Sequence, residues 1–329
     1  MTVSTVRMER AASAVRSTRT SRPKIKRQLV IWAMLTPALL GLGVFFGYPL
    51  VANIYFSLTR YNLLTPPEWI GFRNYIYLFT QDPAIVTATL NTLWLVVILV
   101  PVRVISAMAV AGLLTRVKHG SGFWRTLFYL PALVPPVAST VAFVFLFNPG
   151  TGPVNQVLKF FGIQGPLWFS DPAWSKPSLV LLGMWVLGDI MIIFLASFLD
   201  VPQEQYEAAA LDGANGLQKL RYVTIPTVIP VIVFAVITGV IAALQYFTEA
   251  AVASSVASGT AGVNNGIGAL LGYPANSLLT YTEWLYVRGF SNFQLGYAAA
   301  LAVVLFVVAS VFVGILLRQF KAFSPEDAS

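Results

Sequence analysis

Charged residues are scarce in this 329-residue chain: Asp, Glu, Lys and Arg together make up 10% of it, against roughly 25% in an average soluble domain. Three long stretches, residues 28–59, 126–158 and 289–317, contain no charged residue at all. Each is longer than the ~20 apolar residues that span the hydrocarbon core of a bilayer. With 57% hydrophobic residues, the composition excludes an ordinary soluble protein and indicates an integral membrane protein.

The chain also lacks cysteine and has a single histidine, His119. It can therefore form no disulfide framework, thiolate nucleophile or cysteine metal site, and one histidine cannot build a histidine cluster. No Gly-x4-Gly-Lys-Ser/Thr phosphate loop, Gly-x-Ser-x-Gly or His-Glu-x-x-His motif occurs in the sequence. We therefore predict no catalytic residue, no metal site and no cofactor in this chain, which argues against an enzyme.

Apolar runs long enough to cross a bilayer occur six times. They are residues 29–57, 85–114, 126–147, 178–198, 225–253 and 295–317. These runs lack the alternation of apolar and polar residues that a membrane β-barrel requires, so they predict helices. Proline and glycine inside them are expected to kink the helices rather than break them. The predicted fold class is an all-α integral membrane protein, a bundle of six spans.

Lysine and arginine are distributed unequally between the two sides of such a bundle. Fifteen of the 21 lie in the N-terminal tail, the C-terminal tail and the loops after the second and fourth spans; five lie in the opposite loops. By the positive-inside rule, both termini of this multi-pass protein are cytoplasmic. Residues 1–28 then form a disordered basic tail, residues 29–320 the membrane domain in the lipid bilayer, and residues 321–329 a second tail. The net charge of +8 reports orientation, and nucleic acid is not an expected partner.

The loop between the fourth and fifth spans, residues 200–224, is rich in small residues. Its Ala-rich stretch predicts a helix that Gly213 ends, followed by a second short helix over residues 217–222. Small residues let a partner's backbone approach closely, and Glu207 and Asp212 can pair with cationic groups on that partner. The sequence predicts a compact two-helix knob at the membrane surface.

Nine positions of this region resemble the EAA loop of the permease subunits of binding-protein-dependent ABC importers. They are Glu207, Ala208, Ala209, Asp212, Gly213, Ala214, Leu220, Ile225 and Pro226. Leu220 departs from the pattern, because many members have Phe there. The resemblance implies the ABC importer type I permease fold and a coupling helix that docks into a cleft of the ATPase subunit, carried by Glu207, Ala208, Ala209, Asp212, Gly213 and Ala214.

Other stretches resemble the carbohydrate-importing, maltose-transporter-type branch of the same family. They include residues 45–62, 69–79 and 125–163, and Gly272-Tyr273-Pro274 stands where many members have Gly-Gly-Pro. The Gly-rich stretch 254–271 is the least similar part. The resemblance implies a prokaryotic plasma-membrane protein that works with a second homologous permease, two ATPase subunits that bind ATP and Mg²⁺, and an extracytoplasmic solute-binding protein. The expected substrate is a sugar.

Ionisable residues inside the predicted spans are Arg103, Asp189 and Glu249. Because each costs free energy in contact with lipid, each should face the bundle interior or a water-filled cavity. Gln245 and Glu249, one turn apart, would share a helix face. We therefore predict a solute path lined by Asp189, Gln245, Tyr246 and Glu249. Alternatives remain: an Asp189–Arg103 ion pair that fixes helix register, Glu249 at the headgroups, and Gln245 as interhelical glue.

An ion-coupled secondary transporter of a small polar solute is the rival prediction. In that case Asp189 and Glu249 would bind protons or cations, and no ATPase would take part. The sequence shows no internal repeat of the kind that many secondary transporters contain. A membrane-embedded enzyme or scaffold is a further alternative, which predicts no transport.

Overall fold

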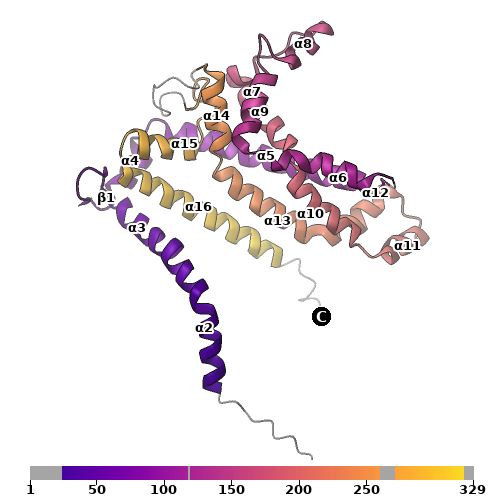
Figure 1. Ribbon diagram of the computed structural model, residues 1–329, viewed down its shortest axis with the longest axis horizontal. Coiled ribbons are helices and arrows are strands. Elements are labelled where there is room, and N and C mark those ends of the chain that lie inside the picture. The colour runs from indigo at the N-terminus through magenta and orange to yellow at the C-terminus, as the bar shows by residue number, and fades with distance from the viewer. Residues whose placement is uncertain (1–23, 118, 260–270, 322–329) are drawn as a thin grey trace, which may run out of the picture. The chain divides into compact units, whose positions relative to one another are not determined.

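The computed structural model describes residues 24–117, 119–259 and 271–321, most of which are helical (Figure 1). The chain divides into two units at Ala52. The first unit contains α2 (Lys24–Leu42), with Pro37 inside it, a π-helical turn (Gly43–Gly47) and the start of α3 (Tyr48–Ser57). The predicted N-terminal tail lies mostly outside the described residues, and helix α2 already begins at Lys24.

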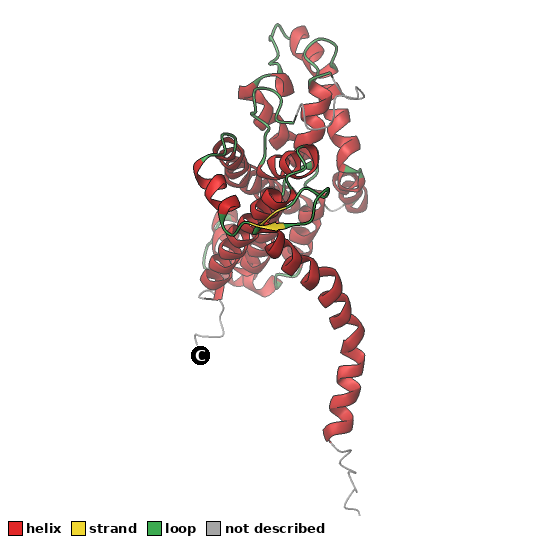
Figure 2. Cartoon of the chain, turned by 90° about the vertical axis from the view of Figure 1, so that its left-hand side faces the viewer, coloured by secondary structure: helices red, strands yellow, loops and turns green. Residues whose placement is uncertain are grey.

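The second unit opens with the one departure from an all-helical prediction among the described residues. Strands β1 (Thr59–Arg60) and β2 (Glu68–Trp69) form a small antiparallel hairpin, drawn in yellow in Figure 2. The short helix α4 (Arg73–Thr80) follows. Asn74 of α4 donates hydrogen bonds to the carbonyl oxygens of Ser57 (2.8 Å) and Thr59 (2.9 Å). These bonds anchor the hairpin region ahead of the first long helix of this unit.

Helix α5 (Ile85–Leu114) is the centre of the second unit, and α10 (Gly188–Leu199) and α13 (Ile225–Leu244) pack along it. Ala107 and Ala111 of α5 are fully buried, as are Phe194 of α10 and Val228 of α13. Small residues on α5 let the neighbouring helices approach closely, which is how helices associate in a membrane. Pro101 lies inside α5 without ending it.

Breaks, rather than kinks alone, interrupt three of the predicted spans. Helices α6 (Ser121–Tyr129) and α7 (Pro136–Leu146) are separated by a 3-10 turn (Leu130–Leu133) and bend by 98°. Val134 and Pro135 are extended, with ψ of 130° and 137°, because proline disfavours helical geometry in the preceding residue. Pro135-Pro136 therefore separates the 3-10 turn from α7 and interrupts the continuous helix predicted for 126–147.

The predicted helix 178–198 is likewise split, between α9 (Pro172–Trp185) and α10, which meet at 48°. The predicted helix 225–253 ends at Leu244 and resumes as α14 (Thr248–Ala257). By length and composition, four helices in the described part of the chain can each cross a membrane alone, or six segments can if each bent pair counts as one.

The remaining elements connect these helices or close the chain. They are α8 (Pro153–Phe160), a 3-10 turn (Trp168–Ser170), α11 (Gln203–Leu211), α12 (Gly216–Lys219), π-helical stretches at Leu220–Thr224 and Val287–Ser291, α15 (Tyr281–Tyr286) and α16 (Leu295–Lys321). Within the second unit, α11 and α12 lie at one end, and α4, α15 and the hairpin lie at the other (Figure 1). Of the Gly-rich stretch 254–271, residues 260–270 lie outside the described part.

Candidate functional site

The turn after α11 is a Schellman motif. The N–H of Gly213 donates to the carbonyl of Ala210 (3.1 Å), and the N–H of Ala214 donates to that of Ala209 (2.9 Å). These two bonds satisfy carbonyl groups that a helix end otherwise leaves unpaired. Gly213 has φ = +77°, a left-handed conformation that glycine adopts without steric cost. The prediction that Gly213 ends the helix is therefore confirmed, and the reason is its backbone conformation.

Helix α12 begins with a capping box two residues later. Asn215 accepts a hydrogen bond from the N–H of Gln218 (3.0 Å), and the Gln218 side chain accepts one from the N–H of Asn215 (2.7 Å). The hydroxyl groups of Tyr206 and Thr224 lie 2.8 Å apart and join α11 to the π-helical stretch before α13. The loop between α10 and α13, residues 200–224, is thus a bonded two-helix unit.

The surface of this α11–α12 loop combines exposed apolar and acidic side chains. Leu211 is 90% exposed and Leu217 is 74% exposed. The six predicted coupling residues lie together on the loop: Glu207, Ala208, Asp212 and Gly213 are exposed, while Ala209 and Ala214 are half-buried.

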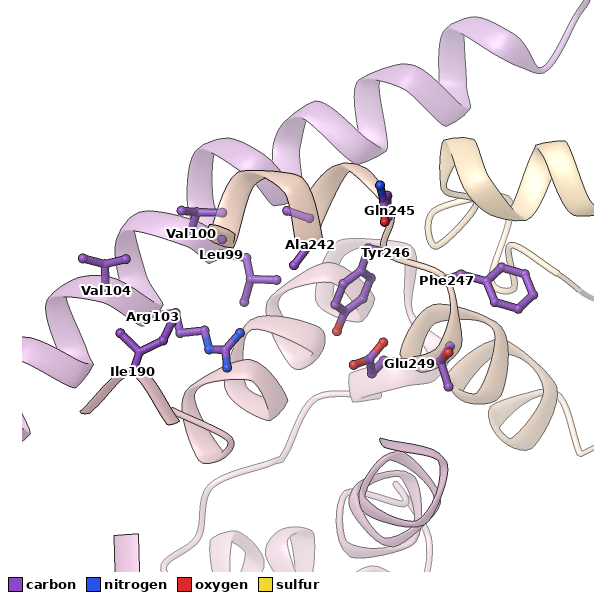
Figure 3. A pocket seen from close by; sticks show the side chains of 13 residues that line it. Leu99, Val100, Arg103, Val104, Ile190, Ala242, Gln245, Tyr246, Phe247 and Glu249 are labelled. Carbon is purple, nitrogen blue, oxygen red and sulfur yellow. The ribbon is translucent and has the colours of Figure 1, made fainter. Parts of the chain in front are cut away.

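Two cavities, of about 160 Å³ and 250 Å³, lie beside the break between α13 and α14. The residues that line both are Leu99, Arg103, Tyr246 and Glu249. Gln245 and Thr248 line only the first cavity, and Ser139 lines only the second. Figure 3 shows the side chains of Arg103, Tyr246 and Glu249 turned toward a common space.

Arg103 is held in place by Asp189. Its Nη2 lies 2.8 Å from Oδ1 and 3.0 Å from Oδ2 of Asp189, and it also donates to the carbonyl of Val186 (3.1 Å). The Nε atom of Arg103 is buried and has no hydrogen-bond partner in the described part of the chain. The ion pair brings α5 and α10 together and leaves the rest of the guanidinium at the cavity wall.

The four residues predicted for a solute path are only partly brought together. Gln245, Tyr246 and Glu249 line the first cavity, although the break at residues 245–247 removes the continuous helix on which their shared face was argued. Asp189 lines neither cavity and instead pairs with Arg103, as one of the alternatives held.

Arg103 lines both cavities, as expected for an ionisable residue inside a predicted span, although it was not among the four residues chosen for the path. Ser139 and Thr248 were also missed. Serine and threonine are ordinary in membrane helices, so no sequence pattern distinguishes these two.

A polar cluster at the other end of the unit was not predicted either. Its centre is the buried carboxylate of Asp82, which accepts hydrogen bonds from Trp284 (2.8 Å) and Tyr297 and an ion pair from Arg288 (3.4 Å). The Arg288 guanidinium also lies over the rings of Tyr77, Trp284 and Tyr297, at 5.6, 4.6 and 5.4 Å from their centroids. Burial raises the pKa of Asp82, but these hydrogen bonds and the Arg288 charge hold it below its ordinary value.

These observations indicate the class of protein: a multi-pass helical membrane protein with broken helices around a polar cavity and an exposed two-helix loop. A family model described as "Binding-protein-dependent transport system inner membrane component" matches residues 103–322, which include the loop and most of the residues that line the cavities. The chain belongs to this family, and it is a permease subunit of an ABC importer rather than an enzyme. The match favours this function over the ion-coupled secondary transporter.

Named relatives agree with this assignment over most of the chain. The probable ABC transporter permease protein YesP of Bacillus subtilis is 33% identical over 309 residues, which are 93% of this chain and 94% of that protein. The lactose transport system permease protein LacF of Rhizobium radiobacter is 32% identical, over 89% of this chain and 95% of that protein.

One solved structure shows the same fold. It is a bacterial alginate ABC transporter in complex with an alginate pentasaccharide-bound periplasmic protein. It is similar to this chain with a TM-score of 0.68 at 23% identity, and the match covers 89% of this chain and 94% of that one.

Proposed function

We propose that the chain is one of two permease subunits in an importer that moves a carbohydrate across the prokaryotic plasma membrane by alternating access. The other subunits are a second homologous permease, two ATPases that carry ATP and Mg²⁺, and an extracytoplasmic solute-binding protein. The family description, which names dependence on a binding protein, is the observation that carries this proposal.

The proposal includes a topology of six spans with both termini in the cytoplasm. Each bent pair then counts as one span, and the break after Leu244 lies within the fifth. The excess of lysine and arginine on one side assigns the α11–α12 loop to the cytoplasm and the α4–α15 end to the outer side. Those two regions lie at opposite ends of the second unit in Figure 1, as this topology requires.

The α11–α12 loop is proposed to receive the movement of the ATPase. Force transmission needs a contact that does not deform, and the Schellman turn, the capping box and the Tyr206–Thr224 hydrogen bond stiffen this loop. Leu211 and Leu217 supply apolar contact area, while Glu207 and Asp212 supply acidic partners for basic groups. ATP binding would close the ATPase dimer, move the loop and turn both permeases outward.

The cavity lined by Gln245, Tyr246 and Glu249 is proposed to be part of the sugar path. Sugars are bound by hydrogen-bonding groups next to aromatic rings, and this wall supplies an amide, a carboxylate and a phenol. Asp189 contributes by holding Arg103 at the wall. Lactose and alginate occur in the names of related proteins, which supports a carbohydrate as substrate class.

Purification and uptake together test the proposal. We expect a tagged chain, expressed with its neighbouring genes, to copurify with an ATPase, and vesicles containing the complex to take up sugar in a vanadate-sensitive manner. Calorimetry on the partner binding protein identifies the sugar to use. Uptake that stops with an ionophore and continues with vanadate would contradict the proposal and support an ion-coupled transporter.

A further inference from the structure

The segment between residues 271 and 286, called here the wedge, is folded into the bundle. Leu278, Leu279, Thr280 and Glu283 are each at most 3% exposed. Connecting segments normally run over the surface, because their backbone polar groups need partners. This segment ends in α15 and has hydrogen-bond partners on four different helices: α5, α9, α14 and α16, where the carbonyl of Leu301 accepts from the Tyr281 hydroxyl (2.9 Å).

Helix α5 holds the wedge through two side chains. Asn91 donates to the carbonyls of Asn276 (2.8 Å) and Leu279 (3.0 Å), and Thr92 accepts from the N–H of Tyr281 (2.9 Å). The bonded residues are separated by more than 180 positions in the sequence. The middle of the wedge is therefore fixed to the start of the central helix.

Helices α9 and α14 hold it from two further directions. The hydroxyl oxygens of Ser175 in α9 and Ser277 in the wedge lie 2.8 Å apart. Ser254 of α14 donates to the carbonyl of Tyr273 (3.3 Å). These anchors are small polar side chains, whose hydrogen bonds are each worth only ~0.5–1.5 kcal/mol net. The wedge also buries Leu278, Leu279 and Tyr281, so an apolar interface holds it together with these bonds.

The wedge also touches the wall of the sugar cavity. Thr282 donates to the carbonyl of Tyr246 (2.7 Å), inside the break between α13 and α14. Phe247, which also lines the first cavity, packs its ring against Tyr286 of the wedge, with centroids 5.3 Å apart. A helix break is a natural hinge, because its residues lack the bonds that continue a helix. The position of the wedge thus sets the position of the cavity wall.

We propose that the wedge is a movable gate on the outer side of the cavity, with Thr282 as the residue that couples it to the cavity wall. In the resting state the polar anchors hold the wedge and the break together. In the outward-facing state the wedge leaves Ser175 of α9, and the break opens the cavity to the incoming sugar. This inference rests on the proposed function, since it requires alternating access.

Cysteine cross-linking tests the gate without knowledge of the sugar. This chain has no cysteine of its own, so the double variant Ser175→Cys/Ser277→Cys introduces a single pair, at positions whose hydroxyl oxygens are 2.8 Å apart. A small movement brings such a pair into disulfide geometry. The complete importer, with cysteine-free partners and the solute-binding protein, is oxidised either without nucleotide or after trapping with ATP, Mg²⁺ and vanadate.

We expect the disulfide to form quickly in the resting importer and at least about tenfold more slowly in the trapped one, which corresponds to ~1.4 kcal/mol. The control is Arg60→Cys/Glu68→Cys, a directly paired position in the β1–β2 hairpin, which should cross-link equally in both states. If the disulfide between positions 175 and 277 formed at the same rate in the resting importer and in trapped samples that retain nucleotide, the gate alone would be overturned. Failure to trap any nucleotide would overturn the proposed function, and the gate with it.

A second variant tests the coupling residue. Thr282→Val keeps the shape of the side chain but loses the bond to Tyr246, whereas Thr282→Ser keeps the hydroxyl. If the wedge holds the resting state, its release favours the state that ATP favours, so Thr282→Val should raise ATP hydrolysis in the absence of the binding protein several-fold. Thr282→Ser should hydrolyse ATP at about the rate of the unaltered chain. Identical rates in both variants would contradict the coupling role.

Discussion

The α11–α12 loop and the wedge are both short connections, but different bonds hold them. In the loop, hydrogen bonds join residues of the loop itself, through a Schellman turn, a capping box and the Tyr206–Thr224 bond. In the wedge, they join residues from distant parts of the chain, as between Asn91 and Leu279. A loop held by local bonds keeps its shape wherever the bundle moves, whereas a segment held by distant helices changes when those helices separate. The first suits a lever and the second suits a gate.

The largest effect should come from the local turn. Gly213→Pro forces φ near −65° where the turn needs +77°, and it removes the N–H that bonds to Ala210. We expect ATP-driven sugar uptake to be abolished while the protein still inserts into the membrane, as measured by uptake and by the amount of protein in membrane fractions.

Gly216→Pro is the matched control, three positions further along the same loop. Gly216 is the first residue of α12, where proline is tolerated, and Asn215 before it is already extended. We expect this variant to transport normally. Normal sugar accumulation by Gly213→Pro would remove the basis for treating the loop as a lever.

The second-largest effect is expected at Asp82, whose hydrogen bonds join it to residues far away in the sequence. Asp82→Ala leaves the Arg288 guanidinium largely buried without its carboxylate partner. Removing one partner of a buried ion pair typically destabilises by ~3–5 kcal/mol, which should appear as a lower thermal unfolding temperature in detergent. Glu68→Ala in the exposed Arg60–Glu68 pair should cost at most ~1 kcal/mol. Similar losses in both variants would mean that the Asp82 cluster does not hold this end together.

A third prediction concerns pH and Glu283. Burial raises the pKa of Glu283 to about 8, and the hydrogen bond from the Thr280 backbone lowers it only in part. The folded state therefore favours the neutral, protonated carboxyl group of Glu283. The stability that this protonated group contributes is fully present below about pH 4.5 and is lost as the pH rises through 8.

The glutamine side chain of Glu283→Gln does not titrate. The free energy of unfolding of this variant should therefore equal that of the unaltered chain at about pH 5 and exceed it at about pH 9. The difference should reach a few kcal/mol, since each unit of pKa is worth ~1.4 kcal/mol. Thermal unfolding at both pH values measures it. A constant difference between the two proteins across this range would contradict the assignment of the raised pKa to Glu283.

The same contrast explains what the sequence could predict. The helix end at Gly213 and the small residues around it are local signals, and the structure confirms the turn. The anchors of the wedge have no such signal, because Asn91 and Ser175 look like ordinary polar residues until the fold brings their partners near. The break at Gln245 contains neither proline nor glycine, so hydropathy predicted one continuous helix there.

The smallest predicted effect separates local from distant bonds most directly. Asn215→Ala removes the cap of α12, which typically costs about 1 kcal/mol. Hydrogen exchange of the amides in residues 216–219 should therefore speed up about fivefold, with no change in the wedge. Asn91→Ala should instead speed up exchange at Tyr281 and at its neighbours in the wedge, and leave α12 unchanged, because its bonds reach backbone groups at residues 276 and 279. If Asn91→Ala changed only the exchange of α5, the wedge would be held by its apolar side chains, and its polar anchors could not act as a release.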